Sequence, residues 1–63
     1  MIETAFEELP PGPRAVVTLR DVEGFDASEA CNILGISETN QRVLLHRGRS
    51  RMRRRLEEYL ERS

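Results

Sequence analysis

Apolar residues recur along this chain at intervals of three and four positions, which is the spacing of one face of an α-helix. Between residues 13 and 22 the recurring apolar residues are Ala15, Val16, Leu19 and Val22. From residue 38 to about residue 62 there is no Pro and only one Gly, and one helical stripe there holds Leu45, Gly48, Met52, Leu56 and Tyr59, flanked by Leu44 and Leu60. The β-branched residues at 16–18 weaken the helical prediction locally, so 15–19 is the one ambiguous segment. The pattern predicts an all-α domain without strands.

Turn and cap residues divide this pattern into four expected helices, near residues 2–8, 12–22, 26–34 and 37–60. The cluster Pro10-Pro11-Gly12-Pro13 separates a short acidic lead from the rest of the chain, and either Pro11 or Pro13 is suited to the first turn of the second helix. Gly24 is placed to end that helix, because Gly adopts the left-handed conformation that a helix end often needs.

The third helix has the clearest beginning. Asp26 is an N-cap candidate and Glu29 follows three positions later, which is the pattern of a capping box, with Phe25 as the apolar residue before the cap. Gly35 is placed to end this helix, and Ser37 is an N-cap candidate for the last one. The expected core of the four helices consists of Val16, Leu19, Val22, Phe25, Ala30, Leu34, Ile36, Leu45 and Met52.

The size and composition of the chain exclude several classes of function. Its 63 residues allow one domain with a modest core, so a deep catalytic cleft is not expected. The chain has a single cysteine, Cys31, and a single histidine, His46, which are too few for an internal disulfide or a zinc site of Cys and His. No pair of residues has the spacing of a catalytic site. The acidic start and the absence of a long apolar run argue against a signal peptide or a membrane span. We therefore expect a reduced, cytoplasmic protein that is not an enzyme and has no cofactor.

The near-neutral net charge of −1 conceals a strong asymmetry. Residues 1–38 carry eight acidic residues and two Arg, whereas residues 39–56 carry seven Arg and no acid. A run of Arg of this kind indicates a polyanionic partner, and nucleic acid is the commonest one.

Residues 26–48 have the pattern of a helix-turn-helix. Small residues, Ala30 and Cys31, occupy the middle of the first helix, Gly35 lies in the turn, and the Arg-rich helix follows. If the second helix enters a major groove, its N-terminal part reaches the base edges. The side chains at that end are Thr39, Asn40, Arg42, Val43 and His46. Arg suits guanine and Asn suits adenine, so this composition favours sequence-specific DNA binding.

Three stretches resemble region 4 of bacterial sigma factors of the extracytoplasmic-function (ECF) group. Residues 9–25, LPPGPRAVVTLRDVEGF, are similar to the start of that region, in which the pattern LPxxxRxVxxLRxxEGxS is common. Residues 29–37, EACNILGIS, are similar to EIAEILGIS, and residues 40–49, NQRVLLHRGR, to TVKSRLHRAR. The resemblance covers roughly residues 9–60 and is far more specific than a general helix-turn-helix.

The resemblance implies a four-helix domain that recognises the promoter −35 element, docks on the flap of the RNA polymerase β subunit and can be sequestered by an anti-sigma factor. By position, Arg42, His46 and Arg47 match residues that face the major groove, with Val43 among them, and Arg49 matches a basic residue near the DNA backbone. The whole chain, 1–63, is then one region 4 domain, with 1–9 a lead helix or linker end and 26–60 the helix-turn-helix. The polymerase-binding region 2 is absent, which implies an excised domain.

Three positions depart from the family pattern. Gln41 replaces a residue that is usually a buried Val or Ile, which puts the seating of the recognition helix in question. Leu44 replaces a usual Arg and either removes a DNA contact or adds to the core. Gly48 replaces a usual Ala, at an expected cost of about 0.5–1 kcal/mol in a helix interior.

Two alternative functions stay open at this point. One is the DNA-binding module of another helix-turn-helix regulator, which would dimerise on a palindromic site and therefore needs a self-association surface. The other is an interaction module bound mainly by an anti-sigma factor, with little DNA affinity of its own.

Overall fold

A computed structural model describes residues 2–62 of the chain, and the side chains of residues 5–62. The elements in chain order are α1 (Ile2–Glu7), α2 (Pro11–Val17), the π-helical segment η1 (Thr18–Val22), α3 (Ala27–Leu34) and α4 (Glu38–Arg62). The described residues contain no strand. The structure therefore confirms the predicted all-α class, with helices close to the four expected ranges.

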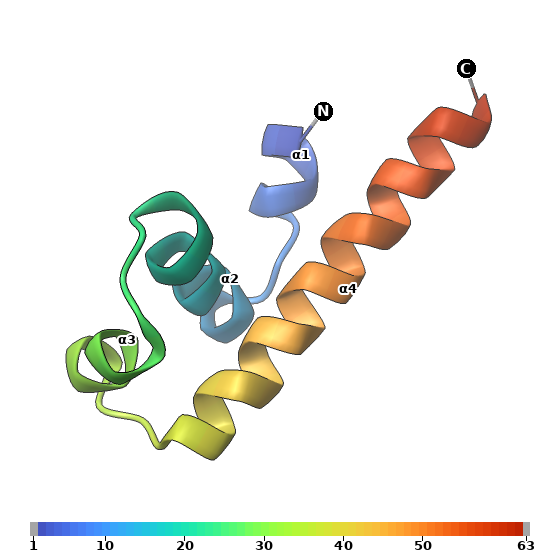
Figure 1. Cartoon of the computed structure of the whole chain (residues 1–63). Helices are drawn as coiled ribbons and strands as arrows, with labels where there is room; N and C mark the ends of the chain where they lie inside the picture. Colours follow the sequence, from blue (N-terminus) through green and yellow to red (C-terminus); the bar gives the residue numbers. More distant parts are fainter. Residues whose placement is uncertain (1, 63) are drawn as a thin grey trace.

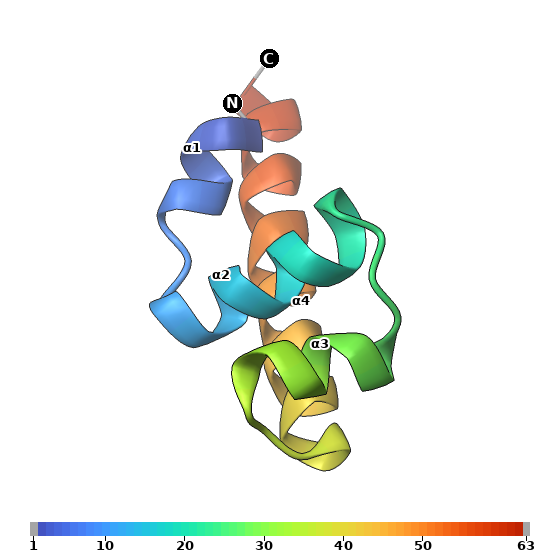
Figure 2. The same cartoon turned by 90° about the vertical axis from the view of Figure 1, so that its left-hand side faces the viewer.

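The long helix α4 is the axis of the molecule. The three shorter helices lie on one side of it, with α1 beside its C-terminal half, α2 beside its middle and α3 near its beginning (Figures 1 and 2). The 25 residues of α4 correspond to a length of about 37 Å, which accounts for the longest dimension of the 40 × 19 × 16 Å molecule. One face of α4 is therefore packed, and the opposite face is left to solvent.

The cap residues identified in the sequence end the helices as expected. Asp26 Oδ1 accepts a hydrogen bond from Glu29 N at 2.8 Å, and Asp26 N donates to Glu29 Oε1 at 3.1 Å, which completes the capping box. Gly35 ends α3 with a φ of 68°, a left-handed conformation that suits Gly. Ser37 Oγ accepts a hydrogen bond from Asn40 N at 3.1 Å and so caps α4. Pro11 is the first residue of α2.

The core lies where α2 crosses α4. Leu9, Val16, Val17 and Leu45 form its buried centre. The residues packed around this centre are Phe6, Leu34, Ile36, Leu44 and Met52. Among the predicted core residues, Val16, Ala30 and Leu45 are buried, and Leu19, Phe25, Leu34, Ile36 and Met52 are partly buried. Cys31 is also buried. Leu44 is partly buried and packs against the core, so of the two alternatives for this position it adds to the core.

The prediction for Val22 is wrong, because its side chain is 68% exposed. The cause is the change from α2 to the π-helical η1. Glu23 N donates to Thr18 O at 2.9 Å across five residues, where an α-helix spans four. This wider turn shifts the side chains that follow Val17 out of the three-and-four register, so Val22 leaves the packed face.

Gly48 lies at the closest approach of α4 to α2. A Cβ added there would lie 2.6 Å from Val17 Cγ2 and 3.3 Å from Pro13 O. Both neighbours are buried, and Val17 is among the most enclosed side chains of the domain. Gly48 therefore lowers the helix propensity of α4 but permits a close interhelical contact, which an Ala would disturb.

Gly48→Ala is accordingly expected to destabilise the domain by about 1–3 kcal/mol, although an added methyl group in an unobstructed helix would stabilise it. Gly12→Ala is the matched control, because its Cβ would meet Leu44 Cδ2 at an ordinary 3.4 Å. Urea unfolding of the two variants measures the difference. A Gly48→Ala variant as stable as the wild type would contradict the close packing of α2 on α4.

Candidate nucleic-acid interface

Helices α3 and α4 form a helix-turn-helix whose turn runs over residues 35–37. The small buried residues of α3, Ala30 and Cys31, allow the two helices to approach closely. Ile36 of the turn is partly buried against the core, which ties the turn to the rest of the domain. As a result the first turns of α4 project from one end of the molecule, with their outer face in solvent (Figure 1).

The seven residues predicted to contact DNA lie outside the packed stripe of α4. All of them are exposed: Thr39, Asn40, Arg42, Val43, His46, Arg47 and Arg49. The buried residues of the same turns, Gln41, Leu45 and Gly48, point into the domain. Three turns of α4 thus present mainly polar and basic groups to solvent, in the segment that the sequence pattern indicated.

Most of the basic side chains in the Arg-rich part of α4, residues 39–56, are available for an external partner. Within this described stretch, five Arg side chains take part in no ion pair or hydrogen bond: Arg42, Arg47, Arg51, Arg53 and Arg54. Each of them is exposed. Unpaired guanidinium groups attract phosphates and can form bidentate contacts with them.

Comparison with known proteins identifies the family to which this chain belongs. The model of the family described as Sigma-70, region 4, matches residues 1–52. This chain belongs to the sigma-70 region 4 family. One curated relative of this sigma region 4 domain is the ECF RNA polymerase sigma factor SigE of Mycolicibacterium smegmatis, with 38% identity over 52 residues. The match covers 82% of the chain and 20% of the relative, so the domain spans about a fifth of the relative's length.

The comparisons confirm the resemblance to region 4 of the ECF group that the three motifs indicated. They assign the region 4 domain to the DNA-binding proteins of transcription initiation. This family is one of transcription regulators and generally not one of enzymes.

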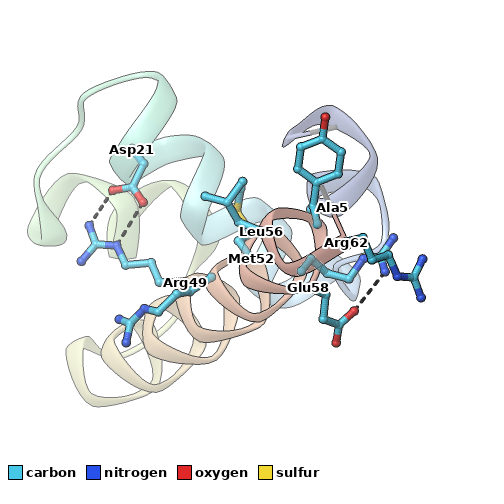
Figure 3. Close-up of a pocket in the computed structure, with 10 residues that line it drawn as sticks. Ala5, Asp21, Arg49, Met52, Leu56, Glu58 and Arg62 are labelled. Carbon is cyan, nitrogen blue, oxygen red and sulfur yellow. Dashed lines mark hydrogen bonds and ion pairs between the residues drawn. The ribbon is translucent and has the colours of Figure 1, made fainter.

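The other two Arg of this stretch are paired within the region 4 domain. Arg49 Nε donates to Asp21 Oδ2 at 3.0 Å, and Arg49 Nη2 donates to Asp21 Oδ1 at 2.5 Å (Figure 3). Arg55 binds Glu8 through Nε at 3.0 Å and Glu58 through Nη1 at 3.3 Å. The family resemblance predicts that Arg49 lies near the DNA backbone, and in the structure this side chain has an internal partner on η1.

The Asp21–Arg49 pair makes the stability of the domain weakly dependent on pH in the acidic range. The hydrogen bonds from Arg49 hold the pKa of the Asp21 carboxyl below its ordinary value, because they favour the charged form. A lowered folded-state pKa stabilises the fold above the unfolded-state pKa, and this stabilisation is lost as the pH falls below about 4. Because both side chains are well exposed, the contribution is at most about 1 kcal/mol.

The free energy of unfolding of the wild type should fall between pH 5 and pH 3. We expect this fall to be smaller in Asp21→Asn, by about 1 kcal/mol or less. Urea unfolding at both pH values measures this, with Glu23→Gln as the control, because Glu23 is an exposed neighbour whose side chain has no partner among the described residues. An equal effect of the two substitutions would show that the pair contributes nothing specific.

A second surface of the domain is an open groove of about 470 Å³ between α1, η1 and the C-terminal half of α4. Its apolar part is formed by Ala5, Met52, Leu56 and Tyr59. Leu56 and Tyr59 are 42% and 44% exposed, respectively, which is high for large apolar side chains. Figure 3 shows Met52 and Leu56 between the Asp21–Arg49 pair and Ala5. The groove exists because the apolar stripe of α4 extends further than the three short helices can cover.

Sequence reasoning placed Leu56 and Tyr59 on the core-facing stripe but did not identify the groove. The available signal was the length of the stripe, which continues for about three turns beyond the residues that α2 covers. Among the described residues no cluster of His, Cys, Asp and Glu could hold a metal ion. No helix within residues 2–62 combines the length and the apolar character needed to cross a membrane.

Proposed function

We propose that this domain recognises a promoter −35 element through the outer face of the first three turns of α4, as the DNA-reading part of an ECF sigma factor. The observation that carries the proposal is the helix-turn-helix, which leaves the seven predicted contact residues exposed along the first three turns of α4, outside its packed stripe. A recognition helix inserts its N-terminal part into the major groove, and this is the end of α4 that projects from the domain. The domain then works in the cytoplasm, where the promoter lies.

Within this face we assign two roles. Arg42 and His46 lie one helical turn apart near the start of α4, with Thr39, Asn40 and Val43 around them, and these side chains are proposed to reach base edges. Arg47 is proposed to face the groove beside them. Arg49, together with the unpaired Arg53 and Arg54 further along α4, is proposed to lie near phosphates, where it adds affinity without sequence preference.

The exposed groove is proposed to hold the flap of the RNA polymerase β subunit. The support is its position on the packed side of the C-terminal half of α4, whereas the DNA-facing surface is on the outer side of the N-terminal half. A domain that directs polymerase to a promoter must bind both partners at once, and two separate surfaces permit this. An anti-sigma factor that occupied the same apolar groove would prevent polymerase binding.

The DNA proposal is tested by selecting duplexes from a random pool with the 63-residue chain and titrating the preferred sequence at 50 and 200 mM salt. We expect one chain per asymmetric duplex and weak binding, whose logarithmic salt slope changes by about 0.9 for each phosphate contact. Tight binding that is insensitive to salt, or two chains on a palindrome, would contradict the proposal. The second result would favour a dimeric helix-turn-helix regulator.

The groove proposal is tested with Leu56→Asp, which places a charge on the apolar surface but leaves the outer face of α4 unchanged. We expect loss of binding to the isolated β flap together with unchanged affinity for the selected duplex. Sedimentation of the wild-type chain should show a monomer. A stable dimer that Leu56→Asp dissociates would instead assign the groove to self-association.

A further inference from the structure

Two consecutive residues of η1 hold the recognition helix at two separate points. Arg20 Nη1 donates to Gln41 Oε1 at 2.6 Å, and Asp21 accepts two hydrogen bonds from Arg49 at 3.0 and 2.5 Å. Among the described side chains, no other hydrogen bond or ion pair joins η1 to α4. We refer to the pair Arg20 and Asp21 as the η1 brace.

The two anchor points lie on either side of Arg42 and His46, the central residues of the proposed base-reading set. Gln41 directly precedes Arg42, and Arg49 follows His46 by three residues. The anchors are eight residues apart, or about 12 Å along the helix axis. A single contact would allow α4 to roll around it, whereas two contacts at different heights fix both the rotation and the tilt of the helix.

Gln41 supplies the more informative anchor, because it is a polar side chain with only 3% of its surface exposed. Burying an amide is costly unless it is hydrogen-bonded, and its carbonyl oxygen obtains a bond from Arg20. No buried side-chain polar atom in the described part of the chain is left without a partner. A Val or Ile at this position would make only non-directional contacts, whereas the hydrogen bond to the Gln41 carbonyl oxygen is directional and favours the observed rotation of α4.

A small rotation of α4 is enough to affect recognition. The surface of a helix lies about 6 Å from its axis, so a rotation of about 20° moves a side chain by about 2 Å. A displacement of this size breaks a hydrogen bond between a guanidinium group and a base edge. Contacts with phosphates tolerate it better, because phosphates are spread along the backbone and carry no sequence information.

From these contacts we propose that Arg20 and Asp21 are positioning residues for DNA reading: they set the rotation of α4 and thereby determine which bases Arg42 and His46 can reach. This inference rests on the proposed function of α4. It predicts that loss of the brace reduces sequence preference while general affinity for DNA is retained. Neither residue needs to touch the DNA itself.

The test compares the affinity for the selected duplex with that for a scrambled duplex, for variants shown by circular dichroism to be folded. Arg20→Met keeps the side-chain length but removes the donor, and we expect the preference ratio to fall about three- to tenfold. Arg14→Met is the matched control, since Arg14 is an exposed Arg of α2 whose side chain has no partner among the described residues. It removes the same charge and should leave the ratio within about twofold of the wild type.

Two further variants separate positioning from stability. Arg20→Lys retains a donor and should recover part of the preference. In Arg20→Met combined with Gln41→Leu, the loss should not exceed that of either single variant, because both remove the same contact. Asp21→Asn, at an exposed site that does not threaten folding, should also lower the ratio while raising affinity for the scrambled duplex, because it removes a negative charge. Additive losses in the double variant, or equal ratios for Arg20→Met and Arg14→Met, would overturn the inference.

A measurement without DNA keeps the inference separate from the proposed function. Residual dipolar couplings of the free domain report the orientation of α4 relative to α2, and Arg20→Met should change it while Arg14→Met does not. If the wild type shows no preference between duplexes but Arg20→Met reorients α4, the DNA proposal is wrong, while the role of the η1 brace in orienting α4 is confirmed. If the wild type shows a preference and Arg20→Met alters neither orientation nor preference, the brace fails alone.

Discussion

Replacing Arg42 by Ala is expected to weaken binding to the preferred duplex by about 1–3 kcal/mol and to flatten the preference at one or two adjacent base pairs. The reason is that a bidentate contact between Arg and guanine contributes discrimination of this size. Arg42 is exposed near the beginning of α4 and has no partner among the described residues, so its loss leaves the fold intact. Fluorescence anisotropy with duplexes altered at single base pairs measures the change.

Arg53→Ala and Arg54→Ala are the controls for this prediction. Both side chains are exposed on the same helix, about 16 Å or more beyond Arg42 along its axis and outside easy reach of the bases that Arg42 is proposed to contact. Their removal should weaken binding to all duplexes alike and lower the salt slope by about one for each phosphate that is no longer neutralised. If Arg53→Ala relaxes the base preference and Arg42→Ala preserves it, the proposed register of α4 on DNA is wrong.

Leu45→Ala is expected to destabilise the domain by about 2–5 kcal/mol, because it leaves a cavity at the crossing of α2 and α4. Leu45 is buried in the centre of the core beside Val16 and Val17. The total stability of a chain of this size is only about 3–9 kcal/mol, so much of the population would unfold. Thermal unfolding followed by circular dichroism detects this directly.

Val43→Ala provides the comparison on the same helix. Val43 lies two residues before Leu45 but is 41% exposed, so its truncation should cost less than about 1 kcal/mol. Equal destabilisation by the two substitutions would mean that the faces of α4 are assigned incorrectly, and with them the surface proposed to meet DNA.

The helix ends could be predicted because their signals are local. Asp26 and Glu29 satisfy one another across a single turn, and Gly35 provides a conformation that other residues rarely adopt. The outward face of α4 was predictable for a similar reason. Regular spacing along one helix fixes which residues share a face, so placing Leu45 inside also placed Arg42 and His46 outside.

Other features depend on partners distant in the sequence, and no local pattern carries them. Val22 fits the three-and-four spacing, but the π-helical turn that begins at Thr18 displaces it. Gln41 was recognisable as an unusual residue at a buried position, yet its partner, Arg20, lies 21 residues away. The close contact that Gly48 makes with α2 likewise became visible only once the two helices were packed together.

The proposed DNA-reading surface can be mapped residue by residue in solution. Backbone amide shifts of the ¹⁵N-labelled domain, recorded with and without the selected duplex, identify the contacted segment. The largest changes are expected over residues 37–49, at the turn and the first three turns of α4, with small changes in α1 and beyond residue 56. Changes concentrated in α1 and the C-terminal half of α4, with residues 37–49 unaffected, would contradict DNA recognition by the helix-turn-helix.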